Sequence, residues 1–221
     1  MAKKSRTPPP PRPVQAPKRR VERRRDGRGR LVYAVLGAIA VAAVAAVGIA
    51  LAVRGGGTSG DAAAGCTTRH FPQQSRAHVA RAAKGFTYNS FPPTSGPHHP
   101  IPAIWGVYEE PIPELTLIHN LEHGGIVVQY GDQVPQKTVN AILQWYNSDP
   151  KGVIVAPLPR LSTIQAKPPA DAERKVYVTA WQNLMTCQGF DAGAFSSFRK
   201  GHRYNGPEKF PPTYYLPGNG A

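Results

Sequence analysis

A single five-residue segment carries the densest chemistry in this sequence. His119, Glu122 and His123 place two imidazoles and a carboxylate within residues 119–123, directly before an apolar run. In a helical turn His119 and His123 would share one face, about 5–6 Å apart at Cβ, which is close enough to bind one metal ion. In an extended strand they would lie about 13 Å apart and could not share an ion. The local backbone therefore decides whether this segment can form a metal site.

A proline-rich segment upstream presents further histidines. His98 and His99 follow residues 92–97, whose prolines restrict the backbone and can hold an imidazole rigidly. With residues 119–123, His98 would complete a set of three histidines and one carboxylate. Such a set suits zinc (Zn) or Cu(II), whereas Cu(I) is disfavoured because Met185 is the only methionine besides Met1. The alternative is a surface loop with two solvated histidines.

The segment from His119 to His123 also fits the H-x-x-E-H pattern of inverted zinc peptidases, in which the glutamate is the general base. Those enzymes carry the motif within a long helix, whereas Gly124 and Gly125 are expected to end any helix here. No nucleophile elbow or triad signature accompanies Ser95 or Cys187. We therefore assign no catalytic residue, and the sequence favours a protein that is not an enzyme over a metal-dependent hydrolase.

The positive charge of the chain is concentrated at its N-terminus. Residues 1–30 carry 12 Lys and Arg against two acidic residues, which accounts for most of the net charge of +14. This proline-rich tail has few large apolar side chains and is predicted to be disordered. Residues 31–53 contain no charged residue and are long enough to span a bilayer as a helix, at about 1.5 Å per residue. The basic residues before them place the N-terminus in the cytoplasm.

These features predict an uncleaved signal anchor in a single-pass membrane protein. The lipid bilayer is therefore an expected partner, and the basic tail is expected to meet anionic lipid, not nucleic acid. Residues 54–65 would form a flexible linker, and residues 66–210 a globular domain outside the cytoplasm. Residues 211–221 are expected to be an irregular tail. The sequence does not specify an oligomeric state.

The outer part contains two cysteines, Cys66 and Cys187. In an oxidising compartment two cysteines favour one disulfide, which would tie the start of the domain to its last third. The alternative is a reactive or metal-ligating Cys187.

The residue pattern from Cys66 onward mixes strands and helices. Short runs rich in β-branched and aromatic residues predict strands at 125–130, 152–156 and 176–181. Apolar residues at helical spacing predict helices at 136–147 and 192–200. About 65 residues before the first predicted strand are expected to be loop-like and rich in proline. The predicted fold class is α/β or α+β, with a small mixed sheet and two or more helices.

Several short motifs occur in the order found in a known family. They include Ser-Gly-Pro-His at 95–98, His-Asn-Leu-Glu-His-Gly at 119–124 and Gly-Pro-Glu at 206–208. In this order, over about residues 70–210, they resemble a bacterial family of membrane-anchored or secreted proteins catalogued only as a domain of unknown function. The resemblance implies no activity. It marks as signature residues His98, His119, Glu122 and His123, and it adds His78.

The sequence therefore predicts a membrane-anchored protein whose outer domain handles or senses zinc or Cu(II) at the cell surface. The expected ligands are His98, His119 and His123, with Glu122 as ligand or hydrogen-bond partner and His78 as a fourth ligand. One alternative is a non-catalytic envelope module, in which the same histidines form a hydrogen-bonded core and a groove binds an envelope protein partner or wall component. The other is a metal-dependent hydrolase.

Overall fold

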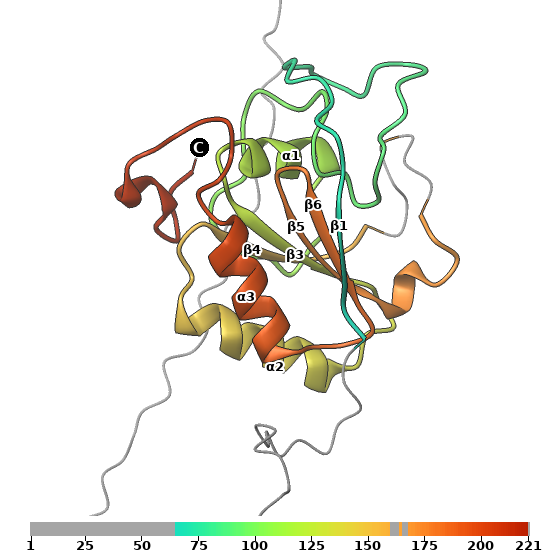
Figure 1. Ribbon diagram of the computed structural model, residues 1–221, viewed down its shortest axis with the longest axis vertical. Helices are drawn as coiled ribbons and strands as arrows, with labels where there is room; N and C mark the ends of the chain where they lie inside the picture. Colours follow the sequence, from blue (N-terminus) through green and yellow to red (C-terminus); the bar gives the residue numbers. More distant parts are fainter. Residues whose placement is uncertain (1–64, 160–163, 165–167, 221) are drawn as a thin grey trace, which may run out of the picture. The chain divides into compact units, whose positions relative to one another are not determined.

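A six-stranded mixed sheet organises the part of the chain that the computed structural model describes, residues 65–159, 164 and 168–220. The strand order is β1-β6-β5-β3-β4-β2 (Figure 1). The strands are Thr67–His70 (β1), Gly106–Val107 (β2), Ile126–Tyr130 (β3), Val153–Pro157 (β4), Val176–Ala180 (β5) and Asn183–Cys187 (β6). The α-helices of this part are Glu114–Glu122 (α1), Gln136–Ser148 (α2) and Ala192–His202 (α3). The predicted mixed α/β class is confirmed.

The sheet combines parallel and antiparallel pairs. Strand β3 runs parallel to β4, and α2 makes the crossover between them, because parallel neighbours cannot be joined by a tight turn. Strand β5 is antiparallel to β3, and β6 is antiparallel to both β5 and β1. The sheet therefore has a parallel half next to α2 and an antiparallel half that ends at β1.

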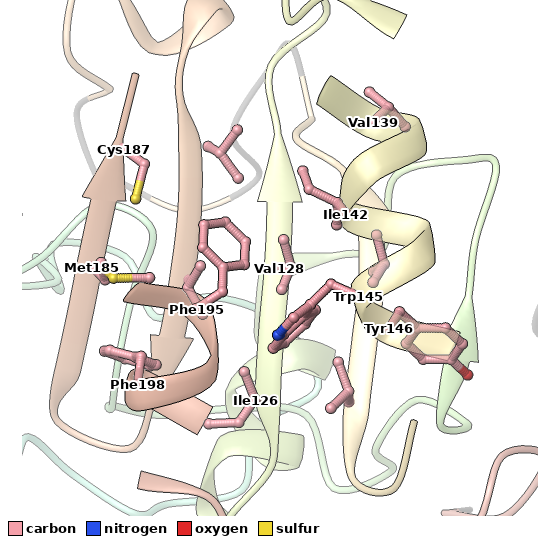
Figure 2. Packing of buried hydrophobic residues seen from close by; sticks show 14 of the residues in the cluster. Ile126, Val128, Val139, Ile142, Trp145, Tyr146, Met185, Cys187, Phe195 and Phe198 are labelled. Atoms are coloured by element: carbon pink, nitrogen blue, oxygen red, sulfur yellow. The ribbon is translucent and has the colours of Figure 1, made fainter. Parts of the chain in front are cut away.

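Alternate residues of the central strands face two different layers. Val127 packs with α1 on one face of the sheet, whereas its neighbour Val128 packs with α2 and α3 on the other. Figure 2 shows Val128 surrounded by Ile142 and Trp145 of α2 and by Phe195 of α3. The helices α2 and α3 thus form a hydrophobic layer, which leaves α1 and the loops on the opposite face to carry polar groups.

The stretch before residue 125, expected to be loop-like, contains β1, β2 and α1. Helix α1 begins after Pro113, which lacks the backbone N–H that the first turn would leave unpaired in any case. It is buried along most of its length, with Glu114, His119, Asn120 and Glu122 among the buried residues. A short helix with so many buried polar groups needs partners from the surrounding loops.

The C-terminal segment packs against the domain, whereas the sequence predicted an irregular tail at 211–221. Residues Pro212–Tyr215 form a 3₁₀ helix, and the Tyr215 side chain is buried. The Tyr215 carbonyl accepts a hydrogen bond from the N–H of Gly152, and the Asn219 carbonyl accepts one from Trp105. The domain therefore continues past the predicted boundary at residue 210.

The predicted basic tail at 1–30 and the predicted membrane span at 31–53 lie outside the described residues. The linker predicted at 54–65 also does, except for its last residue. Among the residues that are described, no helix has the length and apolar character needed to cross a bilayer.

A disulfide joins Cys66, just before β1, to Cys187 at the end of β6. Cys187 is fully buried in the layer beneath α3. All four residues of β1 are exposed, so this edge strand has little apolar burial to hold it in place. The covalent bond therefore anchors the start of the domain to its sheet.

Replacing Cys66 and Cys187 together with alanine is expected to lower the free energy of unfolding by about 2–5 kcal/mol, because a long cross-linked loop restricts the unfolded chain. Urea denaturation of the full-length chain in detergent, followed by tryptophan fluorescence, measures the difference. Adding a reducing agent should bring the wild type down to the stability of the variant. Equal stability of the oxidised wild type and the variant would contradict the proposed anchoring.

Candidate metal centre

Residues 119–123 are helical, which excludes the extended arrangement. His119 and Glu122 lie in the last turns of α1, and His123 caps its C-terminus. The ring centroids of His119 and His123 are 4.4 Å apart. Gly124 and Gly125 then turn the chain into β3, and Gly125 also lets Trp105 approach, since a Cβ there would lie 2.4 Å from the indole ring. The helix therefore ends where the two glycines predicted.

Backbone hydrogen bonds hold the histidine-bearing loops against α1. The residues on either side of His78 bond to the backbone of His98, with N···O distances of 2.7 and 3.0 Å. The N–H of His99 donates to the carbonyl of Leu115 in α1, at 3.1 Å. Hydrogen bonds of the main chain thus hold two histidines in place independently of the contacts of their side chains.

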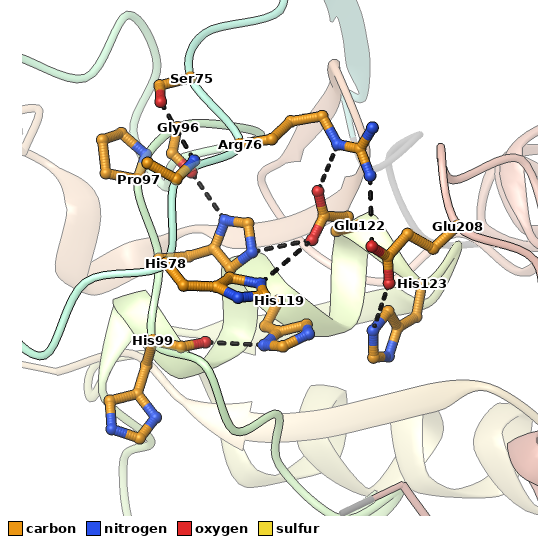
Figure 3. Close-up of polar contacts among 12 residues, drawn as sticks. Ser75, Arg76, His78, Gly96, Pro97, His99, His119, Glu122, His123 and Glu208 are labelled. Atoms are coloured by element: carbon orange, nitrogen blue, oxygen red, sulfur yellow. Dashed lines mark hydrogen bonds and ion pairs between the residues drawn. The ribbon is translucent and has the colours of Figure 1, made fainter.

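Four potential metal ligands converge on this surface of α1. They are His78, His98, His119 and Glu122, whose ligand atoms all lie within 4.8 Å of one another (Figure 3). Glu122 Oε2 is 2.9 Å from His98 Nε2 and 3.8 Å from His78 Nε2. Tetrahedral zinc with bonds of about 2.0–2.1 Å separates its ligand atoms by about 3.3 Å. Small inward movements would therefore close the group around an ion.

The two most buried imidazoles of this group are oriented in the same way. Nδ1 of His98 lies 2.8 Å from the carbonyl oxygen of Gly96, and Nδ1 of His119 lies 2.7 Å from the carbonyl oxygen of His99. Because a carbonyl oxygen only accepts hydrogen bonds, both Nδ1 atoms act as donors. Their Nε2 atoms are the ones left for the cluster. Histidines that bind metals in proteins are held in this way, with the second ring nitrogen donating to an oxygen.

The Glu122 carboxylate is almost completely buried, and a cation pairs with it. Arg76 Nε donates to Glu122 Oε1 at 2.5 Å. Burial by itself would raise the pKa of Glu122, but the Arg76 hydrogen bond and the charge of His98 outweigh it and hold the pKa below its ordinary value. Burial also lowers the pKa of His119. An anionic carboxylate next to a neutral imidazole is the protonation state that metal binding requires.

His123 lies in a second group, with His119 and Glu208. The ligand atoms of these three residues are also within 4.8 Å of one another. His123 Nε2 lies 3.1 Å from Glu208 Oε2, and its Nδ1 lies 2.6 Å from the Tyr214 hydroxyl. Burial, and then the nearby His119, lower the pKa of His123 to about 4. The structure thus brings four of the five expected ligands together in one group. It places the fifth, His123, in a neighbouring group, and His119 belongs to both groups.

Glu208 was not among the expected ligands, although it lies in the Gly-Pro-Glu motif of the resemblance. Its N–H donates to the carbonyl oxygen of Glu122 at 3.1 Å, which brings the two carboxylate-bearing residues side by side. Gly206 makes this approach possible, because a Cβ there would lie only 2.1 Å from that same oxygen. The motif is therefore the signal that could have indicated Glu208.

Arg76 and Tyr214 were not singled out by the sequence either. Arg76 binds Glu122 through Nε and reaches Glu208 Oε1 through Nη2 at 3.2 Å, so one guanidinium bridges both carboxylates (Figure 3). Tyr214 contacts His123 from the C-terminal segment. Neither residue belongs to a motif, and only the folded chain brings them to the cluster.

Acid is expected to destabilise the metal-free protein as the pH falls from about 6.5 to 4. The pKa of His123 is about 4 in the folded protein against 6.5 in the unfolded chain, so the unfolded chain binds more protons in this interval. The contribution of His123 to the free energy of unfolding is complete above pH 6.5 and is lost as the pH approaches 4. It amounts to at most about 3 kcal/mol. Urea unfolding with a chelator present, at several pH values across this interval, should show a smaller loss for His123→Gln than for the wild type. Parallel losses would contradict the assignment to His123.

The chain matches the sequence model of a domain family over residues 78–213, described as a protein of unknown function, DUF3105. No curated protein matches the chain, and no solved structure does. The matched range contains all the residues of both ligand groups, and the expected resemblance to an uncharacterised domain family is confirmed. Because the match spans more than half of its length, the protein belongs to the DUF3105 family of proteins of unknown function.

Proposed function

We propose that the domain binds a transition-metal ion, zinc or Cu(II), through His78, His98, His119 and Glu122. The observation that carries this proposal is the common orientation of the two buried imidazoles: each has Nδ1 on a carbonyl oxygen, which leaves Nε2 for the ligand group, and that of His98 faces the Glu122 carboxylate. Three imidazoles and one carboxylate form a donor set that suits both ions. Met185 packs in the layer beneath α2 and α3, so within the described residues no thioether joins the cluster, which disfavours Cu(I).

A proton at His98 occupies the place that the ion would take. His98 Nδ1 faces the Gly96 carbonyl, and His98 Nε2 faces Glu122 Oε2 at 2.9 Å. Both oxygens are acceptors, so a hydrogen on His98 Nε2 satisfies Glu122 Oε2 where no cation is present. A divalent cation at Nε2 would replace that hydrogen and still neutralise the buried carboxylate. Binding would therefore release a proton, and the network would be complete with either occupant.

Access to the cluster is from the side of His78. Its side chain is 47% exposed, whereas that of Glu122 is 1% exposed. An ion could bind the exposed imidazole first and then enter the buried part of the group. Such a site suits the capture or sensing of a metal from the surroundings of the domain. We place the domain outside the cytoplasm, anchored by residues 31–53 in the membrane, with residues 1–30 in the cytoplasm.

A second candidate function is an architectural one, and it is favoured by the hydrogen bonds of the cluster. Arg76, Glu122 and Glu208 connect three segments that are far apart in the sequence. In this alternative the histidines form the polar core of an envelope module that binds a protein or wall component. A hydrolase is less favoured, because the low pKa of Glu122 makes it a weak base at neutral pH.

Replacing His98 with alanine is expected to lower the affinity for zinc or Cu(II) by more than about 100-fold, since a lost ligand costs at least as much as a lost hydrogen-bond partner of a ligand. The matched control is His99→Ala, because the His99 ring contacts the backbone of Ile101 and lies outside both ligand groups. Calorimetric titration of the chelator-stripped, full-length chain in detergent, with metal content by mass spectrometry, measures both variants against the wild type.

The wild type should bind about one ion, and His99→Ala should bind it equally well. A wild type that binds neither ion, together with a lower melting temperature for His98→Ala alone, would overturn the metal proposal and support the architectural one.

The proposed topology makes a separate prediction. In intact cells, added protease should remove an epitope placed after residue 220 and leave one placed before residue 1 intact, because the membrane protects cytoplasmic segments. Protection of the C-terminal epitope in intact cells, with cleavage only after lysis, would refute the outward orientation of the domain.

A further inference from the structure

We propose that the domain has two overlapping metal positions that share His119 and hold one ion at a time. The first position is the group formed by His78, His98, His119 and Glu122, and this inference rests on the metal binding proposed above. The second position consists of His119, His123 and Glu208, whose ligand atoms also lie within 4.8 Å of one another.

The second position is arranged like the first. The Tyr214 hydroxyl donates to the Gly220 carbonyl at 2.9 Å, so its oxygen is left to accept the hydrogen of His123 Nδ1 at 2.6 Å. His123 Nε2 then carries a lone pair, 3.1 Å from Glu208 Oε2. Two acceptors that face each other at this distance are stabilised by a cation between them. A third buried imidazole is thus held through Nδ1 with Nε2 next to a carboxylate.

His119 cannot serve two ions at once. Its Nδ1 is bound to the carbonyl oxygen of His99, so only Nε2 is available to a metal. One nitrogen lone pair binds one ion. The two positions therefore compete for the same ligand, which is buried between them.

The charge of the cluster also favours a single ion. The guanidinium of Arg76 bridges Glu122 and Glu208, which leaves one net negative charge among the three side chains. One divalent ion changes this to one net positive charge, whereas two ions would leave three. Glu122 is almost completely buried, and uncompensated charge in such a place is strongly disfavoured.

Each position has its own ligand at the surface. His78 is 47% exposed in the first position, and Glu208 is 35% exposed in the second. Figure 3 shows His119 between these two ends of the cluster. An ion that enters at one end can leave at the other after exchange at His119 Nε2. The arrangement suits the transfer of a metal ion from one carrier to another, and it fits permanent storage less well.

The test is zinc titration of the full-length chain in detergent, with His78→Ala, Glu208→Gln and the double variant. His78 is exposed, so its replacement does not disturb the core, and thermal denaturation checks that every variant is folded. The wild type and His78→Ala should each bind one zinc ion per chain. Glu208→Gln should lower the affinity about tenfold or more in the His78→Ala background, and clearly less in the wild type, where the first position is intact.

The matched control is Glu110→Gln, which removes an exposed carboxylate outside both groups and should change the affinity in neither background. Two zinc ions per wild-type chain would overturn the inference, because the positions would then be independent. Equal losses of zinc affinity on Glu208→Gln in the two backgrounds would overturn it as well. They would show that the position containing Glu208 does not replace the first position when His78 is absent. A wild type that binds no zinc would instead refute the proposed function itself.

Discussion

The burial of one carboxylate governs the arrangement of this face of the domain. Glu122 ends α1 with its side chain almost fully enclosed, and a negative charge in such a place must be neutralised by its neighbours. Arg76 supplies a cation from one loop, and His98 supplies a ring nitrogen from another. The main-chain carbonyl of Glu122 accepts a hydrogen bond from the N–H of Glu208, which lies in a third segment. Three loops are thus gathered by a single residue, and the histidines converge because these loops do.

The two faces of the sheet are covered by layers of different character. The face covered by α2 and α3 is apolar and forms one continuous hydrophobic cluster. The other face carries α1, a nine-residue helix with several buried polar side chains. The fold tolerates these polar groups because the stability of the domain does not depend on α1 alone. Asn120 shows how these groups are satisfied, since its side-chain amide pairs with both the N–H and the carbonyl of Ala103.

The elements with a strong residue pattern were predicted: runs of β-branched residues indicated the buried strands, and apolar residues at helical spacing indicated two helices. Strands β3, β4 and β5 and helices α2 and α3 lie within two residues of their predicted bounds. Four elements were missed: β1 is exposed throughout, β2 has two residues, α1 buries polar and apolar residues alike, and β6 mixes buried Leu184 and Met185 with polar residues in a run that is not rich in β-branched side chains. Residue types and short motifs indicated the histidines and Glu122. Arg76 is 46 residues from Glu122, and Tyr214 is 91 residues from His123, so no local pattern could link them.

The disulfide also determines how the domain would respond to mechanical tension. Any force applied through the chain that precedes Cys66 reaches this cysteine before it reaches β1. The covalent bond passes the load directly into β6, which is hydrogen-bonded to strands on both of its sides. Strand β1 is therefore shielded from being peeled off the sheet one hydrogen bond at a time. A domain tethered at this end can be pulled by its tether without opening the edge of the sheet.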